Sequence, residues 1–170
     1  MPFNPPVVND EKKKSSRIGS GGVAGPNEVN PFEATYIYRK ASTAITVGQV
    51  LTFTISDWRS AGLASHVQGS NIFLGVAMEA ATAGEAAAGK VIKIQTAGIC
   101  PNVKCGVTQP GYWATLSAVG GTADGIDPAT IPADAAAAGD FVRDASDKFG
   151  VFLEVDSGGL SSVFIIPPRS

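Results

Sequence analysis

The sequence predicts an all-β protein, built as a small β-barrel, a β-tulip-like fold or a sandwich, with an extended N-terminal arm. Three observations favour this class. In residues 50–55 a Val-Thr-Thr set alternates with a Leu-Phe-Ile set, and this period of two is typical of a strand with one face inward. Short apolar runs recur along the chain between glycine-rich turns. Long helical patterns are missing from the sequence.

The first segment, residues 1–33, holds five of the eleven prolines and a charged run from Asp10 to Arg17. Its apolar residues are scattered, so it cannot bury enough apolar area to offset the entropy lost on ordering. We expect an arm over residues 1–33 that orders on a partner. A chain of 170 residues suits a single core, so we expect one domain over residues 34–170.

Strands are predicted wherever β-branched and aromatic residues gather between turn residues. The predicted strands are residues 36–38, 49–55, 72–79, 91–97, 112–117, 148–156 and 160–167. Loops are predicted over residues 46–49 and 56–62, which are rich in Gly, Ser and Asp. The sequence Asp156-Ser157-Gly158-Gly159 predicts a tight hairpin turn, because adjacent glycines readily adopt positive φ angles.

Helix is expected only in short pieces. Residues 80–88 are rich in alanine but contain Gly84, and residues 133–138 lie between Pro132 and Gly139, so each has room for a turn or two. The stretch from Gly120 to Gly139 is small, polar and without a clear period. We interpret it as an extended surface excursion.

Composition argues against several classes of function. The formal net charge is −2 and the pI near 5.3, so no global basic field draws the chain onto nucleic acid, and a nucleic-acid partner is not expected. The sequence lacks an apolar run long enough to span a bilayer, and it begins without the pattern of a signal peptide. We therefore expect a soluble protein that is not exported by the general route.

Residues for catalysis are sparse, and no enzyme activity, cofactor or metal is expected. His66 is the single histidine, and a surface role without chemistry is favoured for it over that of a catalytic base. No phosphate-binding glycine loop follows a strand. Cys100 and Cys105 have a spacing that allows a hairpin disulfide in an oxidising compartment, although two half-buried free thiols on strands are the favoured interpretation.

Two other groups of residues have a functional and a structural interpretation. Trp58, Trp113, Tyr112 and Phe73 could form a platform for bases or sugars, but aromatic residues on strands more often belong to a core or an interface. Acidic residues late in the chain could gather around calcium, yet their spacing matches no calcium loop, so solvation is favoured. These residues are Asp124, Asp127, Asp134, Asp140, Asp144 and Asp147.

A family resemblance rests on three stretches. Residues 74–85 (LGVAMEAATAGE) and 91–99 (VIKIQTAGI) resemble phage head decoration proteins, in which a strand with Gly-x-Ala precedes an Ala-x-x-Gly-Glu turn and a second strand ends in Gly-Ile. Residues 44–50 (AITVGQV) resemble the turn that opens the first long strand of that family. Residues 86–90 depart from the pattern as an apparent insertion. The glycines Gly48, Gly75, Gly84 and Gly98 fall where a strand turns or another backbone must come close.

The resemblance implies a structural virion protein that decorates the outer surface of a phage head and cements neighbouring copies of the major capsid protein. It also implies a homotrimer at three-fold or quasi-three-fold positions, on a capsid assembled in the host cytoplasm. As the residues that bind the capsid we hypothesise apolar and basic side chains of the arm: Phe3, Lys12, Lys13, Lys14, Arg17 and Phe32. The alternative is a host-attachment or carbohydrate-binding module on the virion, using Trp58, Trp113 and residues 120–139.

Overall fold

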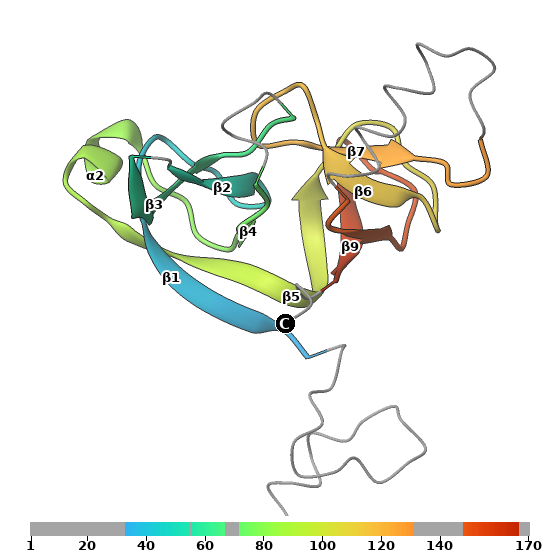
Figure 1. Ribbon diagram of the computed structural model, residues 1–170, viewed down its shortest axis with the longest axis horizontal. Coiled ribbons are helices and arrows are strands. Elements are labelled where there is room, and N and C mark those ends of the chain that lie inside the picture. The colour runs from blue at the N-terminus through green and yellow to red at the C-terminus, as the bar shows by residue number, and fades with distance from the viewer. Residues whose placement is uncertain (1–32, 55, 67–71, 131–147, 167–170) are drawn as a thin grey trace, which may run out of the picture.

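The computed structural model describes residues 33–54, 56–66, 72–130 and 148–166, which form nine strands and one short helix (Figure 1). The all-β prediction is confirmed for these residues. The elements are β1 (Thr35–Ala41), β2 (Val50–Thr54), β3 (Asp57–Leu63), β4 (Gly75–Ala77), α2 (Ala83–Ala87), β5 (Val91–Lys104), β6 (Trp113–Leu116), β7 (Ala123–Ile126), β8 (Gly150–Phe152) and β9 (Leu160–Ile165).

The first half of the sheet closes on itself. Its strand order is β1-β3-β2-β4-β5, and β1 also pairs with β5, so the hydrogen-bonded pairs return to their starting strand. The pairing of β1 with β3 is parallel and covers only Lys40↔Ser60 and Ala41↔Ala61, whereas β1 follows β5 antiparallel from Thr35 to Lys40. We call this small barrel the first ring.

The second half continues from the same long strand in the order β5-β9-β8-β6-β7. A parallel bridge between Cys105 and Ala123 brings β7 back to the end of β5. We call this half the second ring. Figure 1 shows the two rings side by side, the first with α2 at its outer end, and β5 running from one to the other.

Strand β5 serves both rings because it bends midway. Residues 91–97 pair with β1 and β4, and residues 98–104 pair with β9. Gly98 has a φ of +84°, and the register with β9 shifts between Cys100 and Val103, where Asn102 has a φ of 59°. A glycine and a bulge are the usual means of bending a strand. The predicted strand ended at residue 97, so its second half was missed.

The interior contains two apolar clusters, which corrects the expectation of a single core. Leu51, Ala61, Ile92 and Ile94 belong to the cluster of the first ring. A second cluster lies mainly within the second ring and includes Cys100, Val103, Leu116, Phe149, Phe152, Val163 and Ile165. Each ring is narrow, so closing the sheet twice buries two small cores instead of one large core.

Two local predictions are confirmed. Gly158 and Gly159 have φ angles of +62° and +76°, and Ser157 and Leu160 exchange both backbone hydrogen bonds across them, as in a two-residue hairpin turn. The helix α2 spans only five residues. It begins with a capping box, in which the Thr82 hydroxyl accepts from the N–H of Glu85 and the Glu85 carboxylate accepts from the N–H of Thr82.

Three local predictions were wrong. Residues 57–62, expected in a loop, belong to β3, whose small residues Ser60 and Ala61 are buried against β1 and β2. The expected excursion from Gly120 contains strand β7 (Ala123–Ile126), which pairs with β6, although residues 131–147 lie outside the described residues. Gly84 is a helix residue, and a Cβ added to it would meet no atom within 4 Å, so no close backbone requires a glycine there.

Candidate functional site

The hypothesised capsid-binding residues lie outside the described residues. These are Phe3, Lys12, Lys13, Lys14, Arg17 and Phe32. The described chain begins at Glu33, beside the bend of β5: a Cβ added to Gly98 would lie 2.7 Å from the carbonyl oxygen of Glu33. The described chain therefore begins where the two rings meet.

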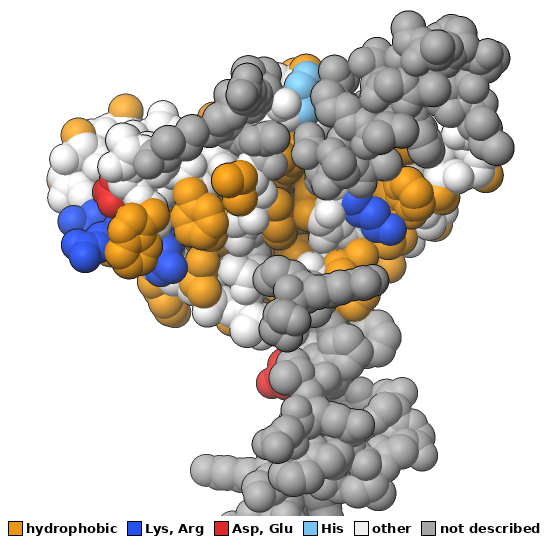
Figure 2. All heavy atoms as spheres, viewed as in Figure 1, with side chains coloured by type: hydrophobic (Ala, Val, Ile, Leu, Met, Phe, Trp, Pro, Cys, Tyr) orange, Lys and Arg blue, Asp and Glu red, His pale blue; other side chains and the backbone are white. Residues whose placement is uncertain are grey.

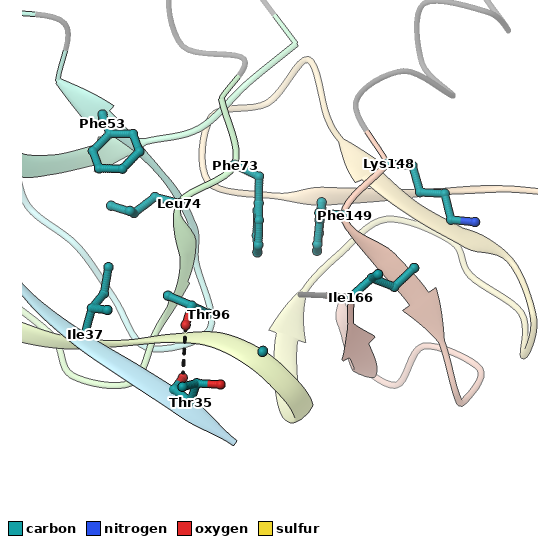
Figure 3. A pocket seen from close by; sticks show the side chains of 10 residues that line it. Thr35, Ile37, Phe53, Phe73, Leu74, Thr96, Lys148, Phe149 and Ile166 are labelled. Carbon is teal, nitrogen blue, oxygen red and sulfur yellow. Dashed lines mark hydrogen bonds between the residues drawn. The ribbon is translucent and has the colours of Figure 1, made fainter. Parts of the chain in front are cut away.

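An apolar groove of about 710 Å³ lies between the two rings (Figure 3). Ile37 of β1, Phe53 of β2 and Leu74 border it on the side of the first ring, and Phe149 and Ile166 on the side of the second. Its other lining residues are Thr35, Phe73, Thr96, Ala97 and Lys148. Concave apolar surfaces with a few polar groups at the margin are typical of binding sites.

Phe73 joins the two sides of this groove. Its ring stacks on that of Phe149, with the centroids 4.2 Å apart and the planes 6° from parallel. Phe73 packs against the second core, whereas the next residue, Leu74, is buried in the first. Consecutive side chains of an extended segment point in opposite directions, so this short segment contacts both cores.

A second surface, on the strands of the first ring, combines exposed aromatic side chains with basic groups. Tyr36, Tyr38 and Trp58 are 40%, 59% and 64% exposed. Lys93 Nζ lies 3.9 Å from the centre of the Tyr36 ring, and the Arg59 guanidinium lies 5.1 Å from that of Trp58. Figure 2 shows apolar side chains beside lysine and arginine on this half of the molecule. We call Tyr36, Tyr38, Trp58, Arg59 and Lys93 the aromatic surface.

Asp57 is the acidic side chain on β3 within this region. The Ser60 hydroxyl donates to its Oδ2 at 2.6 Å and the N–H of Arg59 to its Oδ1 at 3.0 Å. These hydrogen bonds hold the pKa of Asp57 below its usual value. The Asp57 carboxylate therefore accepts these hydrogen bonds from residues of its own strand, β3.

The four aromatic residues considered as a platform do not form one. Trp58 lies on β3 of the first ring, and Trp113 lies on β6 of the second ring, where Lys148 Nζ is 4.3 Å from its ring centre. Tyr112 and Phe73 pack against the second core. Sequence reasoning found Phe73 and Trp58 but not their surroundings, since the groove collects residues that are far apart in the chain.

The two cysteines are free, as the favoured interpretation had it, but both are buried and not half-buried. Cys100 lies on β5 opposite Val163, and Cys105 lies just after the end of β5 and is bridged to Ala123, so the two do not face each other across a hairpin. Burial raises the pKa of Cys100 to about 12 and that of Cys105 to about 11. Within the described residues, no three His, Cys, Asp or Glu side chains are placed to hold a metal ion.

His66 is half-buried, and its backbone N–H donates to the carbonyl of Ser117 at 3.0 Å. Of the acidic residues considered for calcium, Asp124 and Asp127 are described, and the other four lie outside the described residues. Among the residues that the structure describes, no helix is long and apolar enough to cross a membrane.

Comparison with known proteins finds a solved structure of similar fold. No family model and no curated protein sequence matches the chain. The fold resembles the N base of head fiber gp8.5 from bacteriophage phi29. That similarity has a TM-score of 0.51 at 16% sequence identity, and it covers 81% of this chain and 100% of the phi29 chain.

The similarity to the phi29 head fiber base concerns the fold. It supports the all-β architecture that the strand pattern predicted. At 16% identity it says nothing of individual side chains, so the chemistry of the groove and the aromatic surface is interpreted from this chain alone.

Proposed function

We propose that this chain is a structural virion protein of a tailed phage, which sits on the outer surface of the head and cements neighbouring major capsid proteins. The observation that carries the proposal is the fold similarity to a head fiber base, at a TM-score of 0.51. The sequence supports it independently, because residues 44–50, 74–85 and 91–99 resemble head decoration proteins. Both lines of support lead to proteins of phage heads.

The described surface suits a protein that works by contact. Several large apolar side chains are exposed, among them Tyr38, Trp58 and Val107, and the groove adds a concave apolar area. Only 16% of the residues are charged. Apolar area of this kind is characteristic of surfaces that meet other proteins. We assign no catalytic step to the chain.

In this proposal the arm over residues 1–33 lies across adjacent capsid subunits and binds them through Phe3, Phe32 and its basic residues. The protein acts as a homotrimer at three-fold or quasi-three-fold positions. Three weak arms that bind together gain avidity, because after the first contact the others bind at a high effective concentration. Weak individual contacts then suffice to stabilise the shell.

Cosedimentation with phage heads that lack the protein tests this function. The full chain should bind the heads and raise the temperature at which the shells rupture. The variant with Lys12, Lys13, Lys14 and Arg17 all changed to glutamine should keep its circular dichroism spectrum and lose most of the binding. Unchanged decoration by this variant would remove the basic residues of the arm from the mechanism, and no binding by the full chain would contradict the function itself.

Attachment to the host is the second candidate, because the solved structure of similar fold is the base of a fiber. A fiber base would bind the head without strengthening it. This role would be favoured over cementing if the heads bind the protein, still rupture at the same temperature and adsorb better to host cells.

A further inference from the structure

Strand β1 has a free edge beside the groove. The N–H of Ala41 donates to the carbonyl of Lys90, so Ala41, Arg39 and Ile37 point their backbone groups toward β5. The backbone N–H and C=O groups of the alternate residues, Tyr36 and Tyr38, therefore point away from β5. On that side β3 pairs only with Lys40 and Ala41, and no other described strand continues the sheet there.

The free edge opens into the apolar groove. Ile37 lines the groove from β1, and Phe53 lines it from β2 (Figure 3). In the ring order β3 lies between β1 and β2, and it pairs with β1 only at Lys40 and Ala41, so β1 is unpaired on that side over the residues before Lys40. An extended peptide placed along β1 would direct every second side chain toward the face that Ile37 occupies.

Arg39 supplies a charged group at the same place. It follows Ile37 by two residues on β1, so the two side chains share a face of the strand. Its NH1 donates to the carbonyl of Tyr38 at 2.8 Å, one of the free-edge groups. Its Nε is buried and has no hydrogen-bond partner, and no described carboxylate forms an ion pair with the guanidinium.

We propose that the free edge of β1 and the adjoining groove form a strand-addition site for an extended segment of a partner protein, with apolar side chains in alternation and a carboxylate for Arg39. The backbone of the segment pairs with Tyr36 and Tyr38. Its inward side chains contact Ile37, Phe53 and Phe73. Main-chain pairing supplies affinity in such sites, and the pockets for alternate side chains supply specificity.

Charge favours an acidic segment over a basic one. Arg39, Lys40, Arg59 and Lys93 lie on the strands around the free edge, and Lys148 lines the groove. Asp57, the acidic residue of those strands, is already hydrogen-bonded to Ser60. A carboxylate that reaches the guanidinium of Arg39 would form a charge-assisted hydrogen bond in a partly buried place.

The test uses the full chain and a short capped peptide that alternates valine with threonine, in which one valine is replaced by glutamate so that its carboxylate shares the inward face with Arg39. Fluorescence anisotropy of the labelled peptide measures affinity, and NMR of the ¹⁵N-labelled protein shows which backbone amides respond. We expect saturable binding that shifts the amides of Tyr36 and Tyr38. Two control peptides should bind at least about tenfold more weakly: one with lysine in place of glutamate, and one with N-methyl groups on the edge-facing amides.

Protein variants then locate the site. Arg39→Gln should weaken binding of the glutamate peptide about tenfold, which is the effect of losing one charge-assisted hydrogen bond. Lys90→Gln is the matched control: it also removes one positive charge, but Lys90 already pairs with Glu85, so the affinity should be unchanged. Ile37→Ser should weaken binding through the groove, whereas Val107→Ser, at an 81% exposed position elsewhere, should not.

The proposal is overturned if the full chain does not bind the glutamate peptide, or if it binds this peptide no better than the lysine and N-methylated peptides. Equal effects of Arg39→Gln and Lys90→Gln would do the same. The proposal does not depend on the arm binding the head. Cosedimentation of Arg39→Gln with heads, measured separately, shows whether the strand-addition site contributes to that binding.

Discussion

Gly48 and Asn102 lie backbone against backbone at the junction of the two rings. A Cβ on Gly48 would collide with the carbonyl oxygen of Asn102, and both residues have positive φ angles, +84° and 59°. The carbonyl of Gly48 accepts the N–H of Lys104 at 2.8 Å, and its own N–H donates to Ala77. The turn before β2 is thereby fixed onto the bulge that carries β5 into the second ring.

Replacing Gly48 with alanine should therefore destabilise the fold by about 2–4 kcal/mol, since the added methyl group meets both a steric collision and an unfavourable φ. Urea unfolding followed by circular dichroism measures the change. Gly84→Ala is the matched control, because its Cβ meets nothing and alanine favours the helix. It should stabilise by up to about 1 kcal/mol. Equal stability of the two variants would refute the contact.

The Glu85 carboxylate predicts a dependence of stability on pH. It accepts from Lys90 Nζ at 2.9 Å and from the N–H of Thr82, and these interactions lower the pKa of Glu85 from 4.5 to about 2. The Glu85 carboxylate therefore binds a proton more tightly in the unfolded chain than in the folded chain. The stabilisation is complete above about pH 5 and is lost as the pH falls toward 2.

The variant Glu85→Gln isolates this effect. Its free energy of unfolding should lie below that of the unchanged chain at neutral pH, and the gap should close between about pH 5 and pH 2. The gap will be small, because the pair is exposed to solvent. A gap that stays constant over this range would show that the Glu85 charge contributes nothing.

Local chemistry in the sequence was sufficient for some elements. The Ser157-Gly158-Gly159 turn was predictable because only a few residue types accept two positive φ angles in succession. The turn at Gly48, whose φ is +84°, was predictable in the same way, although its contact with Asn102 was not. The turns depend on neighbours in the chain, which a sequence displays directly.

Features that depend on distant pairing were not predictable. The sequence of β3 resembles that of a loop because close packing requires small residues there. A Cβ on Gly62, for example, would lie 3.1 Å from Ser42 Oγ. In β7, a Cβ on Gly125 would lie 3.1 Å from both the Tyr112 ring and the Val107 carbonyl. The groove needed the whole topology, since Ile37, Phe73 and Ile166 meet only after both rings close.

The buried cysteines should resist modification. At about pH 8 few of the thiols of Cys100 and Cys105 are ionised, because their pKa values are raised to about 12 and about 11, and reagents attack the thiolate. We expect a disulfide reagent to react with both only at the rate of unfolding, and rapidly in urea. Val107→Cys adds a thiol at an 81% exposed position and should react at once. Equally fast reaction of Cys100 in the unchanged chain would contradict its burial.

The stacked pair Phe73 and Phe149 should couple the two rings energetically. Phe149 is 4% exposed, and its replacement with alanine should cost about 3 kcal/mol. Phe73→Ala should cost less, because that side chain borders the open groove. In a double-mutant cycle the two changes should be non-additive by about 1 kcal/mol, which is the worth of a stacked aromatic pair beyond its buried area.

A control cycle separates stacking from general loosening of the fold. Ile92→Val removes one methylene from the core of the first ring, where Ile92 is fully buried. Combined with Phe149→Ala, it should give nearly additive effects, because the two residues belong to different cores. Additivity in both cycles would mean that the Phe73–Phe149 contact carries no coupling. Each ring would then be stabilised by its own core, and β5 would be their main connection.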